Sequence, residues 1–246
     1  MKNEITITLP YYNQPEMLKK QLEIWADYPA DVAERVKVII VDDGSPDYPA
    51  LDVLKFGALT LPFPISLYRI KENIPWNHGG ARNLAMTEAQ GWCIVTDMDH
   101  AITEEDMRKL LSMDLQRNSY YMFNRKKVMP DYSIIPLGRH VDSFLLTREA
   151  YWKVGGYNEE FSGYWNGVSR LFRHNLRRRF NWVKLDDVFL TYYDIDVIPD
   201  ASVLTWSKKG GQYDIKSWPN KYIQFKKSLK NYKPINPLRF TWEKVI

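Results

Sequence analysis

The feature that most constrains the fold is a short run of mainly β-branched residues that ends in two carboxylates. The run reads VKVIIV, and Asp42 and Asp43 follow it directly. Apolar runs of this length are typical of a parallel strand that is covered on both faces. A second apolar run, WCIVT, ends in the same way before Asp97 and Asp99. The sequence therefore predicts an α/β fold in which acidic residues follow buried strands.

Segments with helical periodicity separate these runs. Leu18, Leu22 and Trp25 recur at the spacing of one helix face, and Asn13 stands where it could cap that helix ahead of Pro15. Strands alternating with helices form βαβ units, which predicts a mostly parallel central sheet flanked by helices. Further strands are expected at residues 5–9, 65–70, 120–123 and 144–147, and further helices at 81–89 and 168–180.

The length and composition predict one main domain with an appendage. A chain of 246 residues with 45% hydrophobic content can bury one substantial core. We expect this domain at residues 1–198, with a donor half at about 1–100 and an acceptor half at about 101–198. Residues 199–246 form a basic extension, rich in Trp and Tyr, that is expected to wrap over the domain or to be partly disordered at 208–212.

The sequence also gives an expectation for the cellular compartment of the protein. It has no apolar run of about 18 residues and no basic start followed by an apolar stretch, so neither a membrane span nor a signal peptide is expected. The only cysteine, Cys93, lies inside an apolar run and is expected to be a core residue. We therefore expect a cytoplasmic protein. The formal net charge is only +4, but basic residues cluster in the C-terminal half.

The acidic residues are distant in sequence, yet the fold should bring them together. In open α/β sheets, ligands bind beyond the carboxyl ends of the strands, so Asp42, Asp43, Asp97 and Asp99 should meet at one crevice. Paired carboxylates such as Asp97 and Asp99 offer the oxygen ligands that Mn²⁺ or Mg²⁺ prefers, and such an ion can neutralise a departing diphosphate. Alternatively, an acidic pair at a strand end only caps the next helix.

Two further segments fit a nucleotide. In the first, Asp42-Asp43-Gly44-Ser45, a carboxylate can accept hydrogen bonds from a base or ribose, although a simple Asp-Gly turn is the alternative. The second, Gly79-Gly80-Ala81-Arg82-Asn83, opens a helix with small residues. The N-terminus of that helix and Arg82 supply positive potential for phosphate, unless Arg82 only forms a surface ion pair.

Taken together, these segments resemble the family 2 glycosyltransferases of the GT-A fold. The resemblance lies in TLPYYNQPEML, VIIVDDGSPD, NIPWNHGGARN and TDMDH and covers about residues 4–165. It implies an enzyme, of the hexosyltransferase type, that transfers a sugar from a nucleotide-diphosphate sugar, with a UDP-sugar favoured, to a hydroxyl acceptor. It also implies a divalent cation, Mn²⁺ or Mg²⁺, as cofactor.

The resemblance implies roles for individual residues as well. Asp43 would contact the base, with Asp42 close by, and Arg82 would contact the base or the diphosphate. Asp97 and Asp99 would form the Asp-x-Asp motif, with Asp99 as the direct metal ligand. The full set expected around donor and metal is Pro10, Tyr12, Asp42, Asp43, Gly80, Arg82, Asp97 and Asp99.

One segment departs from the family pattern. Where the related enzymes carry a Glu-Asp pair, residues 163–168 read GYWNGV and contain no carboxylate. An inverting transfer needs a general base, for which Asp142, Glu159 and Glu160 are candidates by position in the sequence. Three explanations stay open: a substitute base, a retaining mechanism or an inactive homologue. Candidates for a third metal ligand are His100, His140 and Asp196.

The acceptor is expected to be anionic. Arg170, Arg173 and Arg177 fall on one side of a predicted helix, near Trp165, although such stripes are often only solvated helix faces. Basic and aromatic residues together fit nucleic acid such as hydroxymethylated DNA, and an acidic or lipid-linked glycan at a membrane surface satisfies the same electrostatics.

Two other classes of protein compete with the enzyme. One is an inactive homologue that binds a sugar nucleotide or a nucleic acid, which the missing Glu-Asp pair favours. The other is a nucleotidyltransferase, which accounts for the paired carboxylates but not for the Asp-Asp-Gly-Ser and Gly-Gly-Ala-Arg-Asn segments together.

Overall fold

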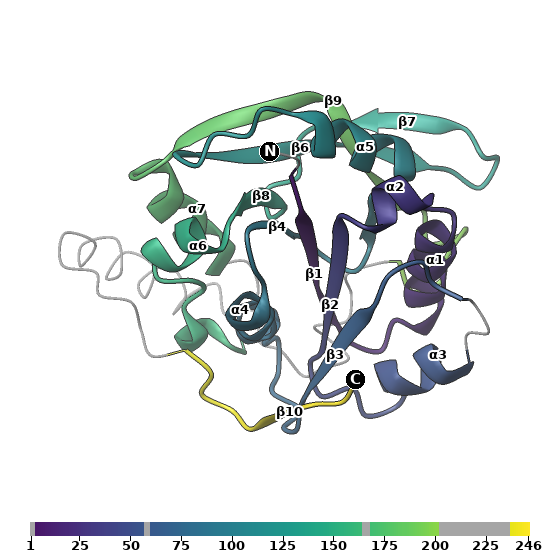
Figure 1. Cartoon of the computed structure of the whole chain (residues 1–246). Helices are drawn as coiled ribbons and strands as arrows, with labels where there is room; N and C mark the ends of the chain where they lie inside the picture. Colours follow the sequence, from purple (N-terminus) through teal and green to yellow (C-terminus); the bar gives the residue numbers. More distant parts are fainter. Residues whose placement is uncertain (1–2, 57–59, 164–167, 202–236) are drawn as a thin grey trace.

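The computed structural model shows one mixed sheet between two layers of helices (Figure 1). It describes residues 3–56, 60–163, 168–201 and 237–246. Within them the strands are β1 (Ile5–Tyr11), β2 (Val36–Asp42), β3 (Ile65–Ile70), β4 (Trp92–Val95), β5 (His100–Ala101), β6 (Ser119–Val128), β7 (Ile134–Leu137), β8 (Phe144–Thr147), β9 (Asn181–Tyr193) and β10 (Trp242–Lys244). The helices are α1 (Pro15–Ala26), α2 (Ala30–Ala33), α3 (Ala50–Phe56), α4 (His78–Glu88), α5 (Glu104–Ser112), α6 (Arg148–Lys153) and α7 (Val168–Arg177), with a 3₁₀ turn at Glu159–Phe161.

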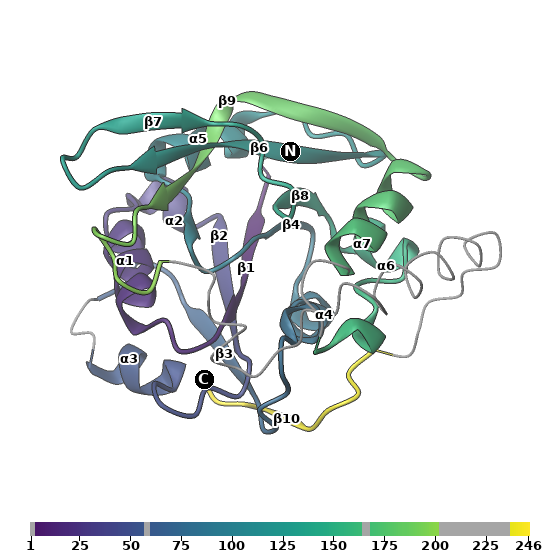
Figure 2. The ribbon, with the colours of Figure 1, turned by 180° about the vertical axis from the view of Figure 1, so that it is seen from behind.

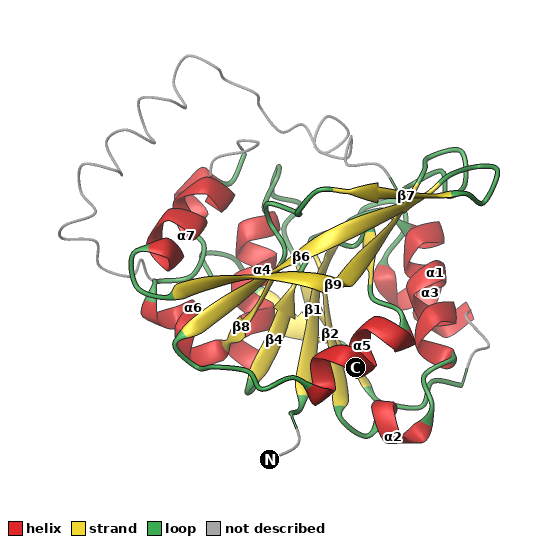
Figure 3. Ribbon diagram, turned by 90° about the horizontal axis from the view of Figure 1, so that it is seen from above, coloured by secondary structure: helices red, strands yellow, loops and turns green. Residues whose placement is uncertain are grey.

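The strand order is β10-β3-β2-β1-β4-β8-β6-β9-β5, and β7 pairs with β6. Pairing is parallel among β3, β2, β1 and β4 and again between β6 and β9, and it is antiparallel elsewhere. The expected α/β fold with a central sheet flanked by helices is confirmed, and Figure 3 shows the strands between the helical layers. The parallel pairing is concentrated in the N-terminal half.

Strand β2 shows why the sheet is buried on both faces. Val38 and Ile40 point into a core with α1, α2, α3 and α5, while Ile39 and Val41 point into a second core with α4, α6 and α7. Figure 2 shows these two groups of helices on opposite sides of the sheet. An uninterrupted apolar run is therefore required, because both sets of side chains leave water.

Helix α1 is capped from a distant part of the chain. The carboxylate of Asp200, which follows β9, accepts hydrogen bonds from the backbone N–H groups of Glu16 and Met17, each at 2.8 Å. Asn13 has a φ of 47° and uses its side-chain oxygen to accept from the N–H of Tyr48 at 3.0 Å. The prediction that Asn13 caps α1 was therefore wrong, because its side chain closes a loop instead.

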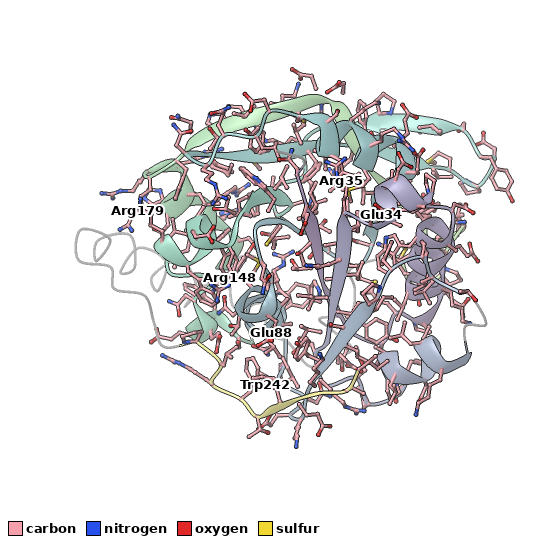
Figure 4. All side chains as sticks on the ribbon, viewed as in Figure 1. Glu34, Arg35, Glu88, Arg148, Arg179 and Trp242 are labelled. Atoms are coloured by element: carbon pink, nitrogen blue, oxygen red, sulfur yellow. The ribbon has the colours of Figure 1, made fainter. Side chains whose placement is uncertain are left out.

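The end of the chain adds a strand to the sheet. β10 pairs antiparallel with β3, and the Trp242 ring lies 5.8 Å from that of Tyr68. The Tyr68 hydroxyl donates to Glu88 at 3.0 Å, and Figure 4 labels Trp242 and Glu88 on the same side of the molecule. Both Asp200 and β10 thus contact the main domain, whose boundary at residue 198 stays a prediction; residues 208–212 lie outside the described part.

The lengths and apolar content of the helices can be compared with what a membrane span requires. None of those that the structure describes is long and apolar enough to span a bilayer. Cys93 is fully buried, as expected of a core residue, and burial raises the pKa of its thiol to about 12.

Candidate donor and metal site

A cavity of about 290 Å³ opens beyond the carboxyl ends of β1, β2 and β4. Asp43, Asp97 and Asp99 line it together, although they follow two different strands. Pro10 and Tyr12, at the end of β1, line it as well. The crevice expected at this edge of the sheet is therefore present, and it gathers three of the four carboxylates.

The fourth carboxylate, Asp42, is used inside the loop. Its oxygens accept from the backbone N–H groups of Ser45 at 2.8 Å and Ala50 at 2.9 Å, so it shapes the turn and caps α3. Asp43 faces the cavity instead, and Asn77 donates to its carboxylate at 3.0 Å. Two adjacent acidic residues thus have separate tasks, and Asp42 does not line the cavity.

A cluster of carboxylates and imidazoles lies at one side of the cavity, which Asp97, Asp99 and His140 line. Ligand atoms of Asp97, His100 and His140 lie within 4.8 Å of one another. Asp99 Oδ1 and His100 Nδ1 are hydrogen-bonded at 2.6 Å, and the centroids of the stacked His100 and His140 rings are 4.1 Å apart. Asp196 is exposed and is not part of this cluster.

One oxygen of this cluster gives a direct test of whether a cation fits. Asp99 is 2% exposed, and its Oδ2 is buried without a hydrogen-bond partner among the residues described. A buried carboxylate oxygen is costly unless a donor or a cation satisfies it. Carboxylate oxygens with imidazole nitrogens nearby are suitable ligands for Mn²⁺. The residues present therefore fit a divalent metal.

The protonation states also agree with a metal site. Burial lowers the pKa of His140 well below its usual range, and the charges of His100 and Arg125 lower it further. His140 is therefore a neutral imidazole, which is the form that binds metals. Burial raises the pKa of Asp97 to about 6, Asp142 and Asp99 add to the rise, and Arg82 opposes it.

Arg82 lies behind the cavity rather than in it. Its side chain is fully buried and donates to Asp97 at 2.5 Å, to Asp142 at 2.6 Å and to the Tyr157 hydroxyl at 2.8 Å. Its contact with a base or diphosphate, which the resemblance implies, stays a prediction. In the structure Arg82 fixes the position of Asp97.

Gly80 is likewise a packing residue. A Cβ atom at this position would lie 2.4 Å from the side-chain oxygen of Asn77 and 2.6 Å from the ring of Phe240. It does not line the cavity. The missing side chain therefore leaves room for the side chains of Asn77 and Phe240 against the first turn of α4, and Asn77 in turn donates a hydrogen bond to Asp43.

The candidate bases differ in their positions. Asp142 lines the cavity, whereas Glu159 accepts from the backbone N–H groups of Leu238 at 2.8 Å and Arg239 at 2.9 Å. Glu160 has a side chain that is 38% exposed, lies 3.8 Å from Arg239 and does not line the cavity. Of these three carboxylates, only Asp142 lines the cavity.

Helix α7 supplies the other wall. Arg170 and Arg173 line the cavity, and Arg177 is exposed further along the helix. The opposite face of α7 is buried, as the amphipathic pattern predicts, through Leu171, Phe172 and Leu176. Trp165 lies outside the described residues.

Some lining residues were not identified from the sequence. Asn77 and Ser169 both line the cavity, and Ser169 donates to Asp142 at 2.6 Å. The segment NIPWNHGGARN was a usable signal for Asn77, because it stands directly before α4. No local pattern marks Ser169, since its partner Asp142 comes from a different element.

The chain was compared with known proteins. A family profile described as Glycosyl transferase family 2 matches residues 6–180. The search of curated proteins found no match. Among solved structures, S. aureus TarS 1–349 in complex with UDP-GlcNAc is similar with a TM-score of 0.61 and 17% identity, over 78% of this chain and 58% of that chain.

Two other solved structures share the fold. The mannosyltransferase PcManGT from Pyrobaculum calidifontis, in complex with GDP-Man and Mn²⁺, has a TM-score of 0.58 and 16% identity over 78% of this chain and 57% of that one. GalNAc-T7 with UDP, GalNAc and Mn²⁺ has a TM-score of 0.59 and 11% identity over 78% and 44%. The chain spans less than two thirds of each of these proteins. On the family match over residues 6–180 and the shared architecture, the chain belongs to glycosyl transferase family 2 and has the GT-A fold.

Proposed function

We propose that this chain is a metal-dependent glycosyltransferase that moves a sugar from a nucleotide-diphosphate sugar, with a UDP-sugar favoured, to a hydroxyl group of an anionic acceptor. The observation that carries the proposal is the buried, unpartnered Oδ2 of Asp99, a residue that lines the cavity together with Asp97 and His140. Support also comes from PcManGT and GalNAc-T7, whose structures contain Mn²⁺.

Each part of the cavity has a task in this proposal. Tyr12 and Asp43 lie at the strand ends where a nucleoside would bind, and Asp43 would accept hydrogen bonds from it. Asp97, Asp99 and His140 would hold the cation. The cation, when bound, supplies positive charge that stabilises the departing diphosphate. Arg82 keeps Asp97 oriented, because its guanidinium is itself fixed by Asp142 and Tyr157.

Asp142 is the proposed general base. It lines the cavity, and its pKa is lowered, because Arg82 and His78 outweigh the rise that burial causes. It is therefore ionised at neutral pH and able to accept a proton. A low pKa makes a carboxylate a weak base, however, and Arg82, Tyr157 and Ser169 already donate to it. This engagement favours the second candidate, a homologue that binds the donor without transferring the sugar.

The experiment is a diphosphate-release assay over a panel of nucleotide sugars, with Mn²⁺ or with EDTA. Release by the native protein should require the metal, and Asp99→Asn should abolish both this release and metal-dependent binding of the nucleotide. Asp196→Asn is the matched control, because that carboxylate is exposed and outside the cluster.

Two other outcomes separate the alternatives. Metal-dependent nucleotide binding without release from any donor would favour the inactive homologue over the enzyme. Nucleotide binding of equal strength in Mn²⁺ and EDTA would refute the metal assignment.

A further inference from the structure

A basic and aromatic surface adjoins the cavity next to α7. Arg139 precedes β8, and its guanidinium stacks over the ring of Trp182 on β9 at 4.9 Å from the ring centroid. Trp182 is 48% exposed. Its neighbour across the parallel pairing of β9 with β6 is Tyr120. We name Arg139, Arg173, Arg177 and Trp182 together the arginine ledge.

Tyr120 links the members of the arginine ledge in space. Burial raises the pKa of its hydroxyl, and the positive charges of Arg177, Arg139 and Arg173 act against that rise. The geometry agrees with this grouping: Arg173 and Arg177 lie one turn apart on α7, and Arg139 stacks on Trp182, the partner of Tyr120 in the pairing of β9 with β6. Arg173 also lines the cavity, so the ledge continues into the site where the sugar would be transferred.

The arginine ledge carries three guanidinium groups, and Asp142 is an acid whose charge acts on one of them, Arg173. Among the residues that the structure describes, Arg139, Arg173 and Arg177 form no ion pair with a carboxylate. Burial lowers the pKa of Arg173, and the like charges of Arg177 and Arg170 lower it further, while Asp142 opposes this. Guanidinium groups held close together repel one another, and an anion bound between them removes that cost.

The shape of the arginine ledge restricts the class of anion. Guanidinium groups bind phosphate, sulfate and carboxylate through paired hydrogen bonds. Trp182 adds a flat apolar face beside them, on which a ring can stack. Proteins that bind single-stranded nucleic acid stack successive bases on several aromatic side chains, whereas the ledge has one. A saccharide that carries acidic groups fits this arrangement better than a nucleic acid.

We propose that the arginine ledge binds an acidic glycan as the acceptor, with the anionic groups on Arg139, Arg173 and Arg177 and a sugar ring on Trp182. This rests on the proposed function, because the ledge would deliver an acceptor hydroxyl to the cavity that holds the donor. It extends the acceptor site from α7 to β9 and to the segment before β8.

The test measures binding of a fluorescently labelled sulfated oligosaccharide by anisotropy. Arg139→Gln, Arg177→Gln and Trp182→Ala should each weaken binding about fivefold to tenfold, as is usual for the loss of one contact to a charged or stacked group. Trp182→Phe should restore most of the affinity that Trp182→Ala loses, because it keeps an aromatic face. Arg178→Gln removes the same charge from an exposed position just after α7 and should bind like the native protein. Thermal unfolding of each variant checks that it is folded.

Competition separates the classes of ligand. An unlabelled neutral dextran oligosaccharide of the same length should not displace the probe, and single-stranded DNA should displace it less well than the sulfated oligosaccharide does. The proposal would be overturned if Arg178→Gln and Arg139→Gln lost the same affinity for the labelled oligosaccharide. It would also be overturned if single-stranded DNA displaced the probe better than the unlabelled sulfated oligosaccharide does. UDP binding is measured on the same samples. If the native protein does not bind UDP, the proposed function is contradicted, while the oligosaccharide measurements still test whether the arginine ledge binds an acidic glycan.

Discussion

Asp97 and Asp142 bond to the same guanidinium group, that of Arg82, and they do so on different nitrogens. Arg82 is fully buried, and the two carboxylates come from the segment after β4 and the segment before β8. The pKa of Asp97 is raised to about 6 and that of Asp142 is lowered, with burial acting to raise both. Although both carboxylates bind the guanidinium of Arg82, Asp142 is therefore ionised to a lower pH than Asp97.

Replacing Arg82 by lysine should disrupt this arrangement. A lysine ammonium cannot donate in a planar fork to both acids, so one buried carboxylate loses its partner. We expect Arg82→Lys to lower the free energy of unfolding by about 2–4 kcal/mol, measured by urea titration. Arg108→Lys, which alters an exposed pair with Asp31, serves as control and should cause no measurable change. An equal effect of both substitutions would contradict the role given to Arg82.

The stability of the protein should depend on pH through Asp142. Its pKa lies below the usual value of 3.8, so its ionised form stabilises the fold above that pH, and the contribution is lost as the pH falls through the folded-state pKa. Asp142→Asn should lower the unfolding free energy at neutral pH by about 3 kcal/mol. The difference between the variant and the native protein should shrink below about pH 4. Urea titrations at several pH values would measure it, and a difference that stays constant with pH would argue against the assignment.

Gly44 should be intolerant of any side chain. Its φ is +71°, and an added Cβ would lie 2.6 Å from the backbone oxygen of Glu72. Gly44→Ala should therefore cost about 1–3 kcal/mol in unfolding free energy and disturb the loop that carries Asp43. Gly138→Ala, where an added Cβ has open space around it, is the control and should stay close to the native stability. Thermal unfolding of both variants would measure the difference, and equal melting temperatures would contradict the prediction for Gly44.

Cys93 should be chemically inert in the folded protein. Burial raises the pKa of its thiol to about 12, so at about pH 8 only about one molecule in ten thousand carries the reactive thiolate. Iodoacetamide should leave the native protein unlabelled, as measured by mass spectrometry, and should label it fully in denaturant. Rapid labelling without denaturant would mean that the core around β4 opens readily.

Local patterns predicted the parts of the fold that depend on local physics. The β-branched run of β2 and the amphipathic face of α7 were visible because burial imposes a period on the sequence. Asp43, Asp97 and Asp99 were placed at one crevice because the carboxyl ends of parallel strands share an edge. Those inferences needed no knowledge of distant contacts.

The rest depended on distant partners that no spacing reveals. The sequence did not indicate that Arg82 is buried against Asp142 and Tyr157, because these partners come from later elements. The cap of α1 comes from Asp200, and no sequence pattern around Pro15 predicts this contact. Likewise, no spacing in the sequence indicates that Arg139 stacks over the ring of Trp182.

The final strand has a consequence for the handling of the protein. β10 has only three residues and covers the hydrogen-bonding edge of β3, which has six. Without β10 the sheet would end in a longer strand with unsatisfied backbone groups, a surface that pairs readily with its counterpart on another molecule. A version of the chain shortened before residue 237 should accordingly be prone to self-association and precipitation, even though the cavity would keep all of its lining residues.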